Sequence, residues 1–80
     1  MAVFKVGCVQ NSATNNLDQN LLSIDSMTRL AVKKGAQLVC LPEYYSLLEQ
    51  NDEAYFRDGF SQKDHPALAH GIDLAEELGI

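Results

Sequence analysis

The sequence predicts an α/β fold, because two short apolar runs flank an amphipathic helix and a further helix follows them. The apolar runs cover residues 3–9 and 37–41, and the helix between them begins near Leu17. The order strand, helix, strand favours a parallel pair of strands joined by a right-handed crossover. Hydrophobic residues make up 46% of the 80-residue chain and charged residues 21%, which is typical of folded soluble proteins.

The first predicted strand runs from Val3 to Val9 and ends at polar residues, so a loop leaves its carboxyl end. In the helix that follows, apolar residues recur every three or four positions and therefore share one side. These residues are Leu17, Leu21, Ile24, Met27 and Ala31. Asn15 or Asn16 can cap the start of this helix, and Gly35 suits the position after its last turn.

Asn20 falls within this apolar side of the helix. A buried amide must be hydrogen-bonded, so we predict that Asn20 is tied to a neighbouring loop. Asp25 and Arg29 lie one turn apart on the outer face and are expected to pair.

The second predicted strand ends at Pro42, which cannot donate to a strand ladder, and Glu43 follows directly. Glu43 is thus placed at the carboxyl end of an apolar strand, where α/β proteins gather ligand-binding and catalytic groups. A carboxylate there suits general base catalysis, although an acidic residue after a strand can also be a cap or a solvated loop residue. Tyr44 and Tyr45 can either line the entrance to a pocket or pack inside the protein.

The C-terminal half predicts a short helix over residues 51–56 and a longer one that opens at residues 64–66 and ends at Gly79. The predicted inner face of the longer helix consists of Leu68, Ile72, Ala75 and Leu78. No repeat or linker divides residues 1–80, so we expect one domain or part of one. A third strand would come next in an alternating α/β chain, so we expect a domain truncated before that strand.

Composition argues against several classes of protein. Six basic and eleven acidic residues give a net charge of -5 without a basic run, so we predict no nucleic-acid partner. The apolar runs are shorter than the roughly 20 residues that cross a bilayer, and the first residues do not resemble a signal peptide. We therefore predict no membrane partner and a cytoplasmic location.

The cysteines and histidines are expected to have structural roles. Cys8 and Cys40 have no neighbours at metal-ligand spacing, and both fall in strands, where we predict that they are buried. His65 and His70 are five residues apart, which is not the spacing of a helical metal pair, and we predict surface or capping roles. We predict neither a metal nor a cofactor.

Three ordered blocks of the sequence resemble one known family. They are VGCVQN at residues 6–11, Asn20-Leu21, and GAQLVCLPE at residues 35–43. This series is similar to the opening of nitrilase-superfamily, or carbon-nitrogen hydrolase, enzymes. The resemblance implies the N-terminal part of an α-β-β-α sandwich and a Glu-Lys-Cys triad in which Glu43 is the catalytic glutamate.

The resemblance also implies what the complete enzyme would do. It would cleave a small-molecule amide, nitrile or carbamoyl substrate through a thioester, and it would be a homo-oligomer. The family places the Lys and the Cys well downstream, so the 80 residues alone are expected to be inactive. The residues after Glu43 lack the Gly-containing turn of the commoner family form, which leaves the substrate class open.

The sequence leaves two alternative hypotheses. A non-catalytic fragment or pseudoenzyme could retain the fold for assembly. A nucleotide-binding βαβ module is disfavoured, because residues 10–16 contain no glycine for a phosphate-binding loop.

Overall fold

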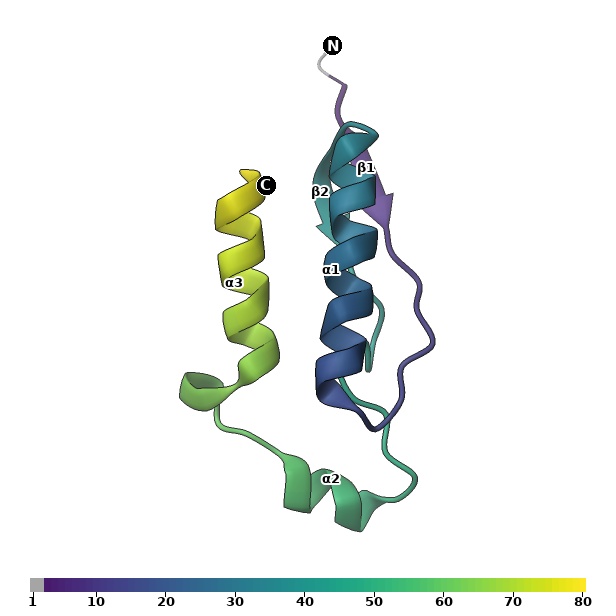
Figure 1. Ribbon diagram of the computed structural model, residues 1–80, viewed down its shortest axis with the longest axis vertical. Helices are drawn as coiled ribbons and strands as arrows, with labels where there is room; N and C mark the ends of the chain where they lie inside the picture. Colours follow the sequence, from purple (N-terminus) through teal and green to yellow (C-terminus); the bar gives the residue numbers. More distant parts are fainter. Residues whose placement is uncertain (1–2) are drawn as a thin grey trace.

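The computed structural model describes residues 3–80, apart from the side chains of Phe56 and Asp58. The elements in chain order are β1 (Lys5–Cys8), α1 (Leu17–Lys33), β2 (Ala36–Cys40), α2 (Asp52–Asp58), the 3₁₀ turn η1 (Gln62–Asp64) and α3 (Pro66–Leu78). Figure 1 shows α1 lying along the strands, α3 running beside α1, and α2 at the far end of the molecule. No helix within residues 3–80 is long and apolar enough to cross a membrane.

The two strands form a parallel sheet, as their order in the sequence predicts. Gly7 lies opposite Val39, and Cys8 lies opposite Cys40. The pairing continues past β1, because the Val9 N–H donates to the Cys40 carbonyl at 2.9 Å. Both strands therefore end at the same edge, and the loops that follow them start side by side.

The ends of α1 follow signals that the sequence carries. Asn16, one of the two predicted caps, accepts a hydrogen bond on Oδ1 from the Gln19 N–H at 3.0 Å. Lys34 ends the helix, and Gly35 follows with a φ of 101°, a conformation that suits glycine because it has no Cβ. Gly35 thus turns the chain directly into β2.

Ile24 is the best buried large side chain among the described residues, with 1% of its surface exposed. Asn20 and Thr28 are also buried, at 3% and 4% exposure. These two polar residues lie one turn before and one turn after Ile24, on the same face of α1. The predicted inner side of α1 is confirmed at Ile24. The other two buried residues of this helix, Asn20 and Thr28, are polar.

Gly7 allows α1 to approach β1 closely. A Cβ at Gly7 would lie 3.0 Å from the Ala31 Cβ and 3.3 Å from the Ala36 Cβ, and neither methyl group can rotate away. We expect Gly7→Ala to lower the free energy of unfolding by about 1–3 kcal/mol through overpacking. Gly71→Ala is the matched control, since its Cβ would meet nothing within 4 Å. It should stabilise α3 by about 0.5–1 kcal/mol.

Urea unfolding of both glycine variants beside the parent protein measures these changes. Equal free energies of unfolding for Gly7→Ala and the parent would show that the space between α1 and β1 can accept a Cβ at position 7.

α3 packs against α1 through Ala67 and Leu74, which are both buried. Leu68 and Ile72, predicted on the inner face, are 39% and 56% exposed, so the prediction is wrong for these two residues. Apolar residues occupy more than one side of α3, and its packing neighbour α1 contacts only the side that carries Ala67 and Leu74. Periodicity alone could not select that side.

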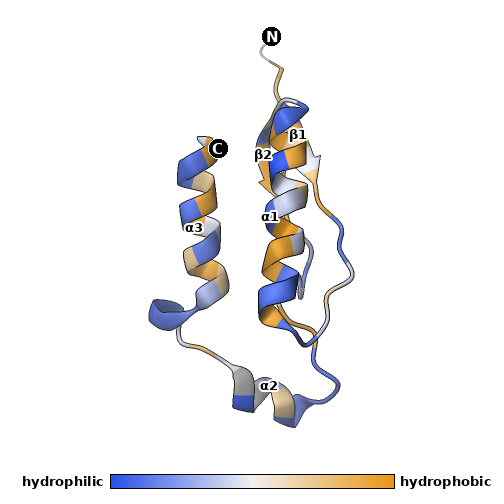
Figure 2. Cartoon of the chain, viewed as in Figure 1, coloured by the Kyte–Doolittle hydropathy of each residue, from blue (hydrophilic) through white to orange (hydrophobic). Residues whose placement is uncertain are grey.

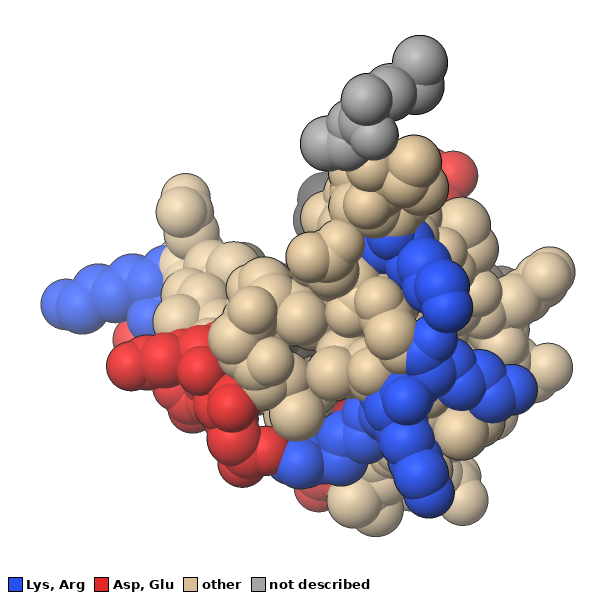
Figure 3. Space-filling view, turned by 90° about the horizontal axis from the view of Figure 1, so that it is seen from above, with Lys and Arg blue, Asp and Glu red and all other residues tan. Residues whose placement is uncertain are grey.

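Charged side chains also join α1 to α3. The Arg29 Nε donates to an Asp25 carboxylate oxygen at 2.6 Å, and Arg29 pairs with Glu77 of α3. The hydrogen bond from Arg29 lowers the pKa of the Asp25 carboxyl, although burial opposes this shift. The predicted pairing of Asp25 with Arg29 is confirmed. Figure 3 shows acidic and basic side chains side by side on the face seen from above.

The sheet face opposite α1 is apolar and exposed. Gly7 faces Ala31 of α1, and alternate residues of a strand point to opposite faces, so Val6 and Leu38 point away from α1. Val6 is 47% exposed and Leu38 is 50% exposed. Figure 2 shows orange, hydrophobic colour on part of β2, and the described elements cover only one side of the sheet.

Candidate active site

Glu43 lies just beyond the carboxyl end of β2, where the sequence places it. β2 ends at Cys40, and Leu41 and Pro42 lead into a turn at Glu43 and Tyr44. The Glu43 side chain is exposed, so its carboxylate is open to a partner or a substrate. Both strands end at this edge, which is the edge where parallel sheets assemble their sites. The catalytic role of Glu43 stays a prediction.

The residue after Glu43 has an unusual backbone conformation. Tyr44 has a φ of 58°, in the left-handed region, which costs a residue with a Cβ roughly 1–2 kcal/mol. Such a conformation persists where the surrounding structure holds it in place. Since Tyr44 adjoins Glu43, the shape of this turn sets the direction in which the Glu43 carboxylate leaves the chain.

Hydrogen bonds join the loop after β1 to the loop after β2. Asn11 Nδ2 donates to the Tyr45 carbonyl at 3.0 Å. Further along the same loops, the Leu48 N–H donates to the Thr14 carbonyl at 2.9 Å. Asn11 and Thr14 carry no sequence signal for these bonds beyond the polar character of their loop.

Asn20 of α1 contacts both loops at once. Its Nδ2 donates to the carbonyls of Thr14 at 2.7 Å and of Ser46 at 2.8 Å. Its Oδ1 accepts from the Thr14 N–H at 3.0 Å. The predicted tie to a neighbouring loop is confirmed, and Asn20 joins two loops rather than one.

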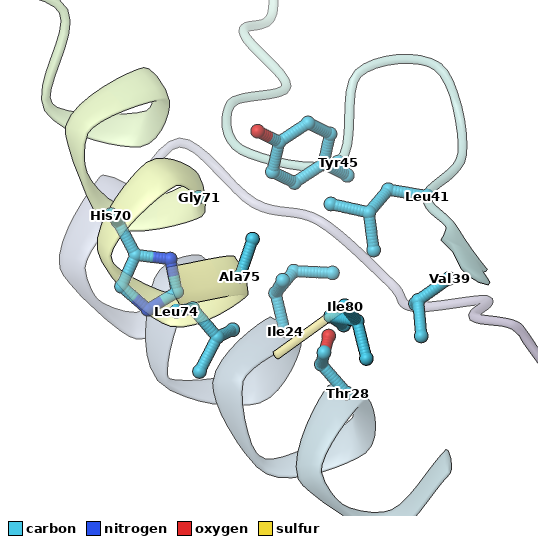
Figure 4. Close-up of a pocket in the computed structure, with 10 residues that line it drawn as sticks. All are labelled: Ile24, Thr28, Val39, Leu41, Tyr45, His70, Gly71, Leu74, Ala75 and Ile80. Carbon is cyan, nitrogen blue, oxygen red and sulfur yellow. The ribbon is translucent and has the colours of Figure 1, made fainter. Parts of the chain in front are cut away.

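The two tyrosines after Glu43 have different surroundings. Tyr45 lines a cavity of about 100 Å³ between α1, α3 and the end of β2, together with mostly apolar side chains (Figure 4). Tyr45 is half-buried there. Tyr44 is 57% exposed, and its ring centroid lies 5.8 Å from that of Tyr55. Both rings line a second hollow, which has a volume of about 280 Å³.

Cys8 and Cys40 are exposed, so the prediction that strands bury them is wrong. They lie opposite each other in the parallel pair, at the ends of β1 and β2. Their strand positions alternate with Gly7 and Val39, so they point to the sheet face that α1 does not cover. No described element packs on that face, which explains their exposure.

The predicted capping role is confirmed for His65, whereas His70 is half-buried between two helices. His65 caps α3, because its Nδ1 accepts a hydrogen bond from the Ala67 N–H at 3.2 Å. His70 Nε2 lies 3.1 Å from Asp25 Oδ2 and thus contributes to the contact between α3 and α1. In the part of the chain that the structure describes, no three His, Cys, Asp or Glu side chains are grouped as metal ligands.

Comparison with known families assigns the chain to one of them. The family model described as carbon-nitrogen hydrolase matches residues 5–80. The chain therefore belongs to the carbon-nitrogen hydrolase family, within the nitrilase superfamily, and the resemblance seen in the sequence is confirmed.

Curated relatives of the chain include three plant enzymes. The N-carbamoylputrescine amidase of Arabidopsis thaliana is 27% identical over 78 residues, which are 94% of this chain and 26% of the relative. The N-carbamoylputrescine amidases of Solanum lycopersicum and Solanum tuberosum are each 28% identical over 79 residues, with the same coverage. The chain thus spans about a quarter of the length of these relatives. No solved structure matches it significantly.

Proposed function

We propose that residues 1–80 are the N-terminal part of a hydrolase domain that cleaves a non-peptide carbon-nitrogen bond, with Glu43 as general base. One observation supports the proposal: in a chain of this family, Glu43 is exposed at the carboxyl edge of a parallel sheet. It lies on a turn that hydrogen bonds to the following residues hold in place. The names of the three plant relatives favour a carbamoyl or other amide substrate over a nitrile.

The proposed reaction uses a Glu-Lys-Cys triad. Glu43 would take the thiol proton while the cysteine sulfur attacks the substrate carbon, and the lysine would stabilise the developing oxyanion. The proton would then pass to the leaving amine or ammonia, and water would release the acid from the thioester. The lysine and the cysteine would come from residues beyond this segment, which covers 26% of its relatives.

The rest of the domain would complete the fold around this segment. We propose an α-β-β-α sandwich in which a second sheet covers the face that exposes Val6 and Leu38, both about half exposed in this chain. The complete protein is expected to be a homo-oligomer located in the cytoplasm. The alternative function is a non-catalytic protein that keeps the fold for assembly. A lysine and a cysteine, each following a downstream strand, would decide for the enzyme.

The 80-residue chain by itself should release no ammonia or amine from an N-carbamoyl amine or a simple amide, because it would lack the nucleophile. The complete protein should release the product. Mass spectrometry of the complete protein during turnover should find the acyl group on a cysteine outside residues 1–80. An acyl group on Cys8 or Cys40 would contradict the proposed triad.

A further inference from the structure

The turn that carries Glu43 is held on both sides. Before it, the Cys40 carbonyl accepts from the Val9 N–H at 2.9 Å, which fixes the end of β2. After it, the carbonyls of Tyr45 and Ser46 accept from side-chain amides, at 3.0 Å and 2.8 Å. Glu43 thus lies on a short stretch of chain with a fixed point at each end.

Asn20 is the buried residue that holds the chain after Glu43, through the Ser46 carbonyl. It is 3% exposed, its Nδ2 donates to the carbonyls of Thr14 and Ser46, and its Oδ1 accepts from the Thr14 N–H. Both amide donors and the acceptor are therefore used, as a buried amide requires. All these partners lie in the loops at the carboxyl edge of the sheet rather than within α1 or the apolar core.

Because of the conformation of Tyr44, the shape of the turn depends on the hydrogen bonds to the Tyr45 and Ser46 carbonyls. Its φ of 58° is unfavourable for a tyrosine, so the turn can relax if the carbonyls that follow it are released. A relaxed turn would redirect the neighbouring Glu43 carboxylate, whereas the rest of the segment keeps the packing of Ile24 and Leu74.

We propose that Asn20 is a positioning residue, which holds the Ser46 carbonyl and the Thr14 backbone so that Glu43 points into the active site. This inference rests on the proposed function, in which Glu43 is the general base. Asn11 supports the same turn through the Tyr45 carbonyl.

The test is a double-mutant cycle in the complete protein, read out as the single-turnover acylation rate with an N-carbamoyl amine. Asn20→Ala should slow acylation by about 10- to 100-fold, because a displacement of the order of 1 Å has effects of this size. The double variant Asn20→Ala, Glu43→Gln should acylate less than about threefold more slowly than Glu43→Gln alone, because Asn20 acts through the Glu43 carboxylate. Asn16→Ala is the matched control: it removes the cap of the same helix and no bond to the Glu43 turn.

Each outcome decides between the two proposals. If Asn20→Ala slows acylation equally in the parent and in Glu43→Gln, or if Asn16→Ala slows it as much as Asn20→Ala, the positioning role is overturned. If Glu43→Gln acylates at the parental rate, the proposed function itself fails. Should Asn20→Ala not fold, Asn11→Ala enters the same cycle, since it removes the Tyr45 bond and leaves α1 unchanged.

Discussion

Replacing Glu43 by glutamine in the complete protein is expected to slow acylation by about 10²- to 10⁴-fold, the usual contribution of general base catalysis. Glutamine keeps the size of the side chain and removes its basicity. Because the Glu43 side chain is exposed, the thermal midpoint should change little. Single-turnover acylation and thermal unfolding, measured on the variant and the parent, separate a catalytic effect from a structural one.

Two further variants test whether the effect is specific to Glu43 and to the position of its carboxylate. Glu76→Gln changes another exposed carboxylate, on α3, and should acylate at the parental rate. Glu43→Asp keeps the charge but shortens the side chain by one methylene, so it should also be slow if the position of the base matters. Parental acylation by Glu43→Gln would show that Glu43 is not the base, and unfolding of that variant would show that the carboxylate is structural.

Replacing Ile24 by alanine should lower the free energy of unfolding by about 2–5 kcal/mol, the range for removing most of a buried aliphatic side chain. Ile24 is 1% exposed and lines the cavity between α1, β2 and α3, so the loss would enlarge a space that already exists. Leu22→Ala is the control, because Leu22 lies on the same helix and is 72% exposed. Urea unfolding measures both variants, and similar changes for the two would contradict a core centred on Ile24.

The elements of the fold were largely predictable because local chemistry determines them. The cap at Asn16, the glycine at Gly35 and the proline at Pro42 act within a few residues of where each stands. Which apolar residues become buried depends instead on the neighbouring elements. Ile72 lies on a side of α3 that no described element covers, and the sequence pattern of α3 does not reveal this.

The candidate site was predictable in part for the same reason. Glu43 follows from the end of an apolar strand, and the bonds of Asn20 follow from a polar residue among buried positions. The bond from Asn11 to Tyr45 joins residues far apart in the sequence, so it depends on the finished fold. Nothing about a tyrosine indicates the left-handed conformation of Tyr44, because that conformation is unfavourable for it.

The exposure of Cys8 and Cys40 makes these two thiols reporters of what covers their face of the sheet. Both are exposed in this chain, at paired positions of the two strands, so an alkylating reagent should label them in the 80-residue protein. They share that face with Val6 and Leu38, which the proposed second sheet would cover, so their labelling should be much slower in the complete protein. A Cys8→Ser, Cys40→Ser protein identifies the part of the labelling that comes from these two residues.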